Sequence, residues 1–179
     1  MIKLVIFDRD GVVNELIFES NKFRSPRSVS EVVINSNINN LMHKLVVAGI
    51  DIAVATNQPE ISRGLVTQKS LLSINNEILR ILGLKFNFFI CSHDDIDECF
   101  CRKPKPGLLL QIIEKHGVSV SEVIFIGDRT IDRDAASNIG MRFLLFRSES
   151  GGGIFELALP NGEALLLSND RVFDWITKL

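Results

Sequence analysis

Short apolar runs alternate along this chain with segments whose apolar side chains recur at helical spacing, and this alternation restricts the fold more than any other feature. The apolar runs predict strands over residues 2–7, 50–55, 86–91, 122–126 and 142–146. The periodic segments predict helices from Asn35 or Ser36 to Gly49, and over 67–82, 106–116 and 132–139. Strand–helix–strand units of this kind predict an α/β fold. We expect a Rossmann-like three-layer α/β/α sandwich around a central, mainly parallel sheet.

The remaining segments are less regular. Asn, Ser and Pro are frequent between residues 11 and 35, which predicts a loop with a short strand over Glu31–Ile34. The tail, Gly151–Leu179, predicts a short strand over Ala164–Leu167 and a helix over Arg171–Lys178. No composition shift or linker divides the chain, so we expect one domain over residues 1–179.

Polar side chains follow several of the predicted strands. Asp8 and Asp10 follow the first strand, Thr56 and Asn57 the second, and Asp128 the fourth. Chemistry in such sheets gathers beyond the carboxyl ends of the strands. One aspartate after a strand is commonly a turn former, but three at adjacent strand ends fit the oxygen ligands that Mg²⁺ requires.

The first two carboxylates are two residues apart, so both can face one pocket while the chain stays extended. Two carboxylates this close repel, which raises one pKa unless a cation compensates. We therefore expect one of them to be an ionised nucleophile and metal ligand, and the other to hold a proton as general acid and base.

Four segments in this order resemble the motifs of the haloacid dehalogenase superfamily of aspartyl-phosphate phosphatases. They are Asp8-Arg9-Asp10-Gly11-Val12-Val13, Thr56-Asn57, Lys103, and Gly127-Asp128 with Asp132. The resemblance implies that Asp8 attacks phosphorus and that Asp10 is the general acid and base. It implies that Thr56 and Asn57 hold the phosphoryl oxygens and that Lys103 offsets their charge. It also implies Mg²⁺ bound by Asp8, Asp128 and the backbone carbonyl of Asp10.

A second ligand set lies between the third strand and the following helix. Cys91, His93, Cys99 and Cys101 provide three thiolates and one imidazole within eleven residues. This is a complete set for tetrahedral Zn²⁺, and a closed shell of four ligands indicates a structural site. Buried cysteines beside a surface histidine are the alternative. Bound zinc would order a loop, 91–101, that ends directly before Arg102 and Lys103.

This loop and its continuation to Gly107 are similar to a superfamily branch that has no large cap domain. The branch contains the D-glycero-D-manno-heptose 1,7-bisphosphate 7-phosphatases and the histidinol-phosphate phosphatases. The segment Ile61–Leu65 favours the heptose enzymes, whereas the loop Leu16–Arg27 departs from their pattern. The resemblance implies a small phosphorylated sugar as substrate. The predicted substrate contacts are Asn57, Gln58, Arg63, Arg102 and Arg129. Arg102 or Arg129 could instead form a surface ion pair, and Arg63 could instead only cap or solvate its loop.

Histidinol phosphate is the alternative substrate, and phosphate at nucleic-acid ends is a third. A catalytically silent, zinc-stabilised binding module is the alternative of another class. The formal charge of −2 and the lack of a basic run argue against nucleic acid. No apolar stretch reaches the roughly 20 residues of a membrane span, and the N-terminus has no signal-peptide pattern. We therefore expect a cytosolic protein, and the branch implies a monomer.

Overall fold

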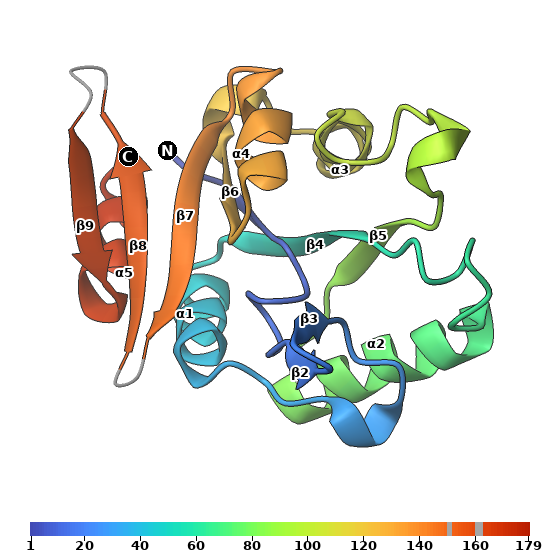
Figure 1. The fold of residues 1–179 in the computed structure, drawn as a ribbon. Helices are drawn as coiled ribbons and strands as arrows, with labels where there is room; N and C mark the ends of the chain where they lie inside the picture. Colours follow the sequence, from blue (N-terminus) through green and yellow to red (C-terminus); the bar gives the residue numbers. More distant parts are fainter. Residues whose placement is uncertain (150–151, 160–162) are drawn as a thin grey trace.

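The computed structural model describes residues 1–149, 152–159 and 163–179, and a seven-stranded sheet forms its centre. The strand order is β5-β4-β1-β6-β7-β8-β9, which Figure 1 shows from right to left. The five strands from β5 to β7 are parallel, and β8 and β9 continue the sheet in antiparallel pairing. The predicted three-layer, mainly parallel α/β fold is confirmed.

The elements have the following bounds. The strands are β1 (Leu4–Phe7), β2 (Ile17–Glu19), β3 (Lys22–Arg24), β4 (Asp51–Asn57), β5 (Asn87–Cys91), β6 (Val123–Gly127), β7 (Arg142–Glu149), β8 (Gly152–Ala158) and β9 (Ala164–Ser168). The helices are α1 (Ser36–Val47), α2 (Gln68–Leu82), α3 (Gly107–His116), α4 (Thr130–Ser137) and α5 (Asn169–Thr177), with short 3₁₀ turns at Val29–Glu31, Asp95–Asp97 and Val120–Glu122.

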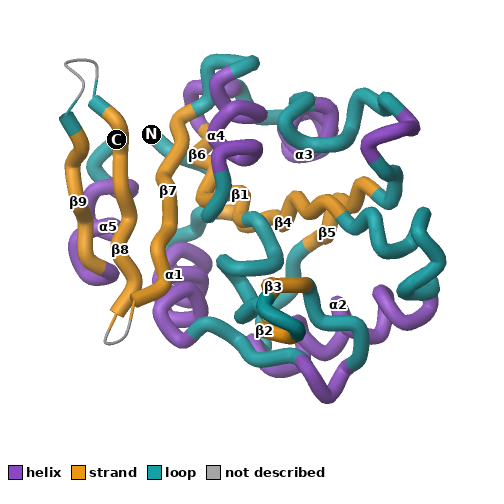
Figure 2. The backbone as a smooth tube through the Cα atoms, viewed as in Figure 1, coloured by secondary structure: helices purple, strands orange, loops and turns teal. Residues whose placement is uncertain are grey.

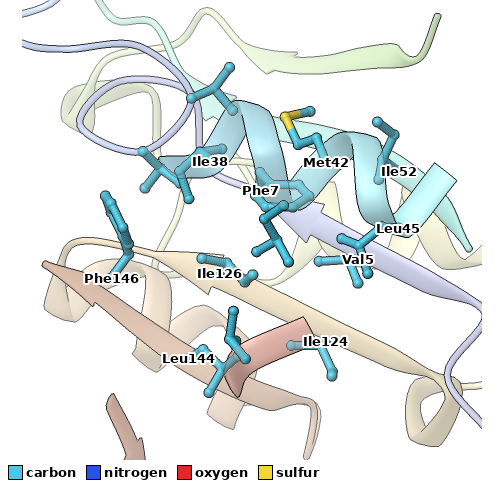
Figure 3. Packing of buried hydrophobic residues seen from close by; sticks show 14 of the residues in the cluster. Val5, Phe7, Ile38, Met42, Leu45, Ile52, Ile124, Ile126, Leu144 and Phe146 are labelled. Atoms are coloured by element: carbon cyan, nitrogen blue, oxygen red, sulfur yellow. The ribbon is translucent and has the colours of Figure 1, made fainter. Parts of the chain in front are cut away.

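The central strand β1 is buried on both faces, as its continuous apolar sequence requires. Val5 and Phe7 face the core formed with α1, α2 and α5, part of which Figure 3 shows. Leu4 and Ile6 point the other way, into the core formed with α3 and α4. Because side chains alternate across a strand, one short run of residues supplies both cores. This double burial fixes where β1 ends, and hence where Asp8 lies.

Helix ends agree with the capping residues in the sequence. The Asn35 side chain accepts hydrogen bonds from the backbone N–H groups of Asn37 and Ile38 at the start of α1. Thr67 caps α2 in the same way through the N–H of Ser70. At the other end of α2, Gly83 adopts the left-handed conformation that ends many helices.

Three sequence-based expectations were wrong. The predicted strand over Glu31–Ile34 is absent: Val29–Glu31 is a 3₁₀ turn, and only an isolated bridge joins Asn14 to Ile34. The predicted loop contains the β2–β3 hairpin, which precedes α1 in the chain and is labelled in Figure 2. In the tail the predicted strand and helix are present, as β9 and α5, and the error is the omission of β8; Gly151, where we placed the start of the tail, lies outside the described residues.

Smaller differences concern element ends. Helix α4 begins two residues before the predicted Asp132, because the Asp132 side chain accepts a hydrogen bond from the backbone N–H of Arg129 and so caps the first turn. Strand β7 extends beyond the predicted Phe146, because it pairs with β8 as far as Glu149. None of the helices in the described ranges has the length and apolar character that spanning a bilayer would need.

Candidate active site

The polar residues predicted from the strand ends meet at one edge of the sheet. Strands β1, β4 and β6 are adjacent and parallel, so Asp8, Thr56 and Asp128 come together at their carboxyl ends. A cavity of about 640 Å³ opens there. Its lining includes Asp8, Asp10, Leu16, Phe23, Arg24, Ser25, Thr56, Asn57, Pro59, Glu60, Arg63, Asp95, Arg102, Lys103, Pro104, Arg129 and Ile131.

Asp8 is buried and paired with Lys103. The Lys103 ammonium donates hydrogen bonds to Asp8 Oδ1 at 2.7 Å and to the carbonyl of Ala55 at 2.9 Å, and it forms an ion pair with Asp132 Oδ1 at 2.6 Å. Burial raises the pKa of Asp8 to about 7. The charge and hydrogen bond of Lys103 oppose this rise, and the charges of Asp132 and Asp128 add to it. One ammonium thus faces several carboxylates, which leaves a local deficit of positive charge.

Asp8, Asp128 and Asp132 have carboxylate oxygens that all lie within 4.8 Å of one another. Burial raises the pKa of Asp128 to about 6, with the charge of Asp132 as the next cause, and Asp128 Oδ1 is buried without a hydrogen-bond partner. Gly11, with φ of +88°, passes so close that a Cβ there would overlap the Asp128 carboxylate. An unpartnered carboxylate oxygen in a crowded acidic pocket fits a hard divalent cation such as Mg²⁺.

Asp10 has a different environment from Asp8, although only one residue separates them. Its carboxylate accepts hydrogen bonds from Arg9 on both oxygens, at 3.0 and 2.9 Å, and from Asn14, Ser25 and Gln58. Burial opposes its ionisation, but the charge and hydrogen bonds of Arg9, with those of Asn14 and Gln58, hold the pKa of Asp10 below its ordinary value. Asp10 is therefore an oriented, ionised carboxylate in the free protein.

The residues at the end of β4 and just after it have two roles: some line the cavity, and others hold the lining residues in place. Thr56 and Asn57 line the cavity, but the Asn57 side-chain amide forms two hydrogen bonds with the backbone of Lys103, at 3.0 and 3.1 Å. Gln58 lies behind them, 3% exposed, and donates to Asp10 at 2.6 Å and to Thr56 at 2.8 Å. This geometry fits a positioning role for Gln58 better than the predicted substrate contact.

The three arginines predicted to bind substrate all line the cavity, but two of them are in ion pairs. Arg63 binds Asp94 through two hydrogen bonds of 2.6 Å, and Arg102 lies 2.7 Å from Asp95. Arg129 has no ion pair within the part of the chain that the structure describes. Arg129 is therefore the cation most available to a second anionic group.

The predicted zinc ligands converge after β5. Sulfur–sulfur separations among Cys91, Cys99 and Cys101 are 3.3–3.6 Å, and His93 Nδ1 lies 3.6 and 3.3 Å from the sulfurs of Cys91 and Cys101. These distances far exceed a disulfide bond of about 2.05 Å. They are close to the ligand separations of roughly 3.5–3.8 Å that Zn–S bonds of about 2.3 Å require in a tetrahedron. The four side chains can therefore hold one metal ion.

Several residues of the site were missed by sequence reasoning. Arg9 is fully buried and joins Asp10 to Asn75 of α2 through its Nη1, and Asn14 and Ser25 complete the donors around Asp10. A charged residue between two strand-end aspartates was the available signal for Arg9. Ser25 had none, because its place depends on the hairpin that precedes it.

Comparison with known proteins gives a consistent result. The family model for haloacid dehalogenase-like hydrolases matches residues 6–146. A D-glycero-beta-D-manno-heptose-1,7-bisphosphate 7-phosphatase of Pseudomonas aeruginosa is 35% identical over 172 residues, which cover 93% of this chain and 92% of that protein. A protein of the same name from Neisseria meningitidis is 35% identical over 143 residues, covering 78% of this chain and 74% of its own.

Solved structures agree with this result. A D,D-heptose 1,7-bisphosphate phosphatase from B. bronchiseptica, complexed with magnesium and phosphate, superposes with a TM-score of 0.81 and 27% identity, covering 99% of each chain. A HAD-like phosphatase structure from Mesorhizobium loti has a TM-score of 0.76 at 22% identity, covering 98% of this chain and 85% of its own, and shares the fold.

Proposed function

Because this chain belongs to the haloacid dehalogenase-like hydrolase family, we propose that it is a magnesium-dependent phosphomonoester hydrolase that forms a phospho-aspartate on Asp8. The observation that carries the proposal is the arrangement at the cavity floor. The Asp8 carboxylate lies 2.7 Å from Lys103 and within a group of acidic oxygens that fits one divalent cation.

We assign the chain's residues the following roles. Asp8 attacks phosphorus and the bond to the leaving oxygen breaks, while Asp10 gives that oxygen a proton. Asp10 then takes a proton from the water that attacks the phospho-aspartate, which releases phosphate and restores both carboxyl groups. Because the pKa of Asp10 is lowered in the free protein, the anionic substrate must raise it on binding.

The transferring phosphoryl group needs donors and positive charge around it. Thr56 and the segment at Asn57 line the cavity where its oxygens would lie, and Lys103 is held against Asp8. Asp8, Asp128 and the Asp10 carbonyl would bind Mg²⁺, with the Asp132 carboxylate also within reach, and the ion would neutralise charge on the phosphoryl group. Gln58 and Arg9 hold the Asp10 carboxylate in place.

We propose D-glycero-D-manno-heptose 1,7-bisphosphate as the substrate, with removal of the 7-phosphate. The named relatives at 35% identity support this choice. Arg129 supports it as well, since it lines the cavity without an ion pair among the described residues and can meet the phosphate that is not hydrolysed. Arg63 and Arg102 would complete that site by exchanging aspartate partners for phosphate oxygens.

We further propose that Cys91, His93, Cys99 and Cys101 bind a structural zinc ion, and that residues 1–179 form one domain that acts as a monomer in the cytoplasm. The three free thiols suit a reducing compartment. Metal analysis of protein purified without chelator tests the zinc site, and a zinc content near zero would remove it.

The test of the function compares heptose 1,7-bisphosphate with histidinol phosphate at steady state, with Mg²⁺ present and released phosphate as the readout. We expect kcat/KM to be at least about a hundredfold higher on the heptose, roughly 2.7 kcal/mol of transition-state preference. The opposite preference would identify a histidinol-phosphate phosphatase. Failure to hydrolyse any phosphate ester would support the silent binding module.

A further inference from the structure

The hairpin formed by β2 and β3 brings apolar surface to a cavity that is otherwise rich in charge. Leu16 and Phe23 line the cavity together with Pro59, Pro104 and Ile131, beside the carboxylates and cations already described. The cavity therefore offers two kinds of contact. Its charged side chains suit a phosphate, and its apolar side chains suit the part of a substrate that carries only carbon and hydrogen.

Among the apolar residues that line the cavity, Phe23 carries an aromatic ring, and this ring is left open to solvent. It is 69% exposed, and its cross-strand partner Phe18 is 63% exposed, with ring centroids 5.0 Å apart at 53°. A two-stranded hairpin with an uncovered aromatic pair gains little stability from those rings. Exposed aromatic rings beside a cavity are more readily explained by contact with a ligand than by packing.

The hairpin is fixed at its base, so Phe23 has a defined place relative to the reacting groups. Two residues after Phe23, the Ser25 hydroxyl donates to Asp10 at 3.0 Å. Arg24 binds Glu19 at 2.8 Å and Glu31 at 2.7 Å, and these ion pairs join β3 to β2 and to the 3₁₀ turn beyond it. An aromatic ring held this way can select a ligand without being ordered anew for each binding event.

We propose that Phe23 determines specificity by packing its ring against a carbon–hydrogen face of a phosphorylated pyranose whose phosphoryl group lies at Asp8. The inference rests on the proposed phosphatase function and names the part of the protein that recognises the leaving group. A pyranose carries hydroxyl groups at its rim and C–H bonds on its faces, so a flat aromatic surface binds it through apolar contact. Acyclic phosphate esters lack such a face.

The experiment measures kcat/KM for heptose 1,7-bisphosphate, for hexose 6-phosphates and for the acyclic ester glycerol 2-phosphate, all with Mg²⁺. Phe23→Ala should lower kcat/KM about tenfold on the cyclic substrates, mainly through KM, and by less than about twofold on glycerol 2-phosphate. Phe23→Trp should keep the preference for cyclic substrates. Phe18→Ala is the matched control, since Phe18 belongs to the same ring pair but does not line the cavity.

The outcomes separate the inference from the proposed function. If the wild type hydrolyses heptose 1,7-bisphosphate and Phe23→Ala leaves the ratio of cyclic to acyclic kcat/KM unchanged, the inference alone is overturned. Equal losses on all esters in both alanine variants would show that the rings only stabilise the hairpin, which also overturns it. If the wild type prefers a hexose phosphate, the proposed substrate fails and the inference is judged on that sugar. A wild type that hydrolyses only the acyclic ester overturns both.

Discussion

The molecule holds two groups of potential metal ligands that are built in different ways. The acidic centre, formed by Asp8, Asp128 and Asp132 around Lys103, collects residues that are up to 124 positions apart, with Asp8 and Asp132 at its two ends. The cysteine cluster, formed by Cys91, His93, Cys99 and Cys101, lies within eleven positions of one loop. The first is assembled by the parallel sheet, whereas the second can assemble itself once an ion binds.

This difference has consequences for stability and for chemistry. The acidic centre has crowded carboxylates, and the pKa values of Asp8 and Asp128 are raised. Keeping these groups ionised in the folded chain therefore lowers the free energy of unfolding. In the cysteine cluster, only Cys91 belongs to the sheet, as the last residue of β5, and a single 3₁₀ turn lies between His93 and Cys99. A bound ion would hold the rest of this segment in place. We therefore expect damage to the acidic centre to remove activity and leave the fold intact, and damage to the cysteine cluster to weaken the fold first.

The largest expected effect is that of Asp8→Asn. An amide cannot attack phosphorus, so kcat/KM should fall by at least about a thousandfold, while the metal content of the cysteine cluster should not change. Phosphate release and metal analysis on the same preparation measure both quantities. Asp51→Asn, the same change at the exposed start of β4, is the control and should keep full activity. Activity of Asp8→Asn within tenfold of the wild type would exclude Asp8 as the nucleophile.

The second prediction concerns the cysteine cluster. Cys101→Ser should abolish binding of the structural ion and lower the free energy of unfolding by on the order of 3 kcal/mol, because the loop loses its anchor. Activity should fall less than in Asp8→Asn, since Lys103 is still held by Asp8 and Asp132. Thermal unfolding and metal content are the measurements, with Ser92→Ala as the control inside the same loop. A Cys101→Ser variant with unchanged stability and full zinc content would show that Cys101 is not a ligand.

The two regions also differ in how far the sequence predicts them. The cysteine cluster needs only local spacing, and its four side chains converge as expected. The acidic centre needs the strand order, which strand–helix alternation supplies, so Asp8, Thr56 and Asp128 were placed together correctly. The hydrogen bonds that Asp10 receives from Ser25 and Gln58 depend on side-chain directions that no periodicity encodes.

The missed elements have physical reasons. The β2–β3 hairpin turns through Ser20 and Asn21, both with positive φ, and lacks the Asn-Gly or Asp-Gly pair that usually marks such a turn. Strand β8 begins at Gly152, and glycine is depleted in strands, so the sequence carries no strand signal there. Gly153 is needed there because a Cβ would overlap the ring of Phe146, a contact that exists only after β7 and β8 have paired.

A third prediction tests how tightly the acidic centre is packed. In Gly11→Ala the new Cβ would overlap the Asp128 carboxylate, so the Mg²⁺ concentration for half-maximal activity should rise about tenfold or more. Gly49→Ala is the control, because Gly49 also has a positive φ, of +75°, but has open space around it. It should cost about 1 kcal/mol of stability and leave the Mg²⁺ dependence unchanged. Equal Mg²⁺ dependence in the two variants would mean that Asp128 does not bind the ion.

The last prediction concerns the pH dependence of the metal-free protein, which needs no substitution. Burial raises the pKa of Asp8 to about 7 and that of Asp128 to about 6, against an ordinary value of 3.8. At pH values between the raised pKa of the folded state and the ordinary pKa of the unfolded state, the folded state binds more protons. The free energy of unfolding therefore increases as pH falls from about 8 to about 5. Denaturant titrations in chelator should show a gain of at most about 4 kcal/mol in the wild type and a smaller one in Asp8→Asn.

Saturating Mg²⁺ should reverse this trend, because the ion binds the ionised carboxylates and its stabilising effect grows as pH rises. The lowered pKa of Asp10 does not contribute in this window, since its stabilisation is lost only when pH falls below the ordinary range for aspartate. If the metal-free wild type and Asp8→Asn have the same pH dependence, folding does not raise the pKa of Asp8, and ionised Asp8 does not lower the free energy of unfolding. The proposed cost of burying the acidic centre, on which the contrast between the two regions depends, would then be wrong.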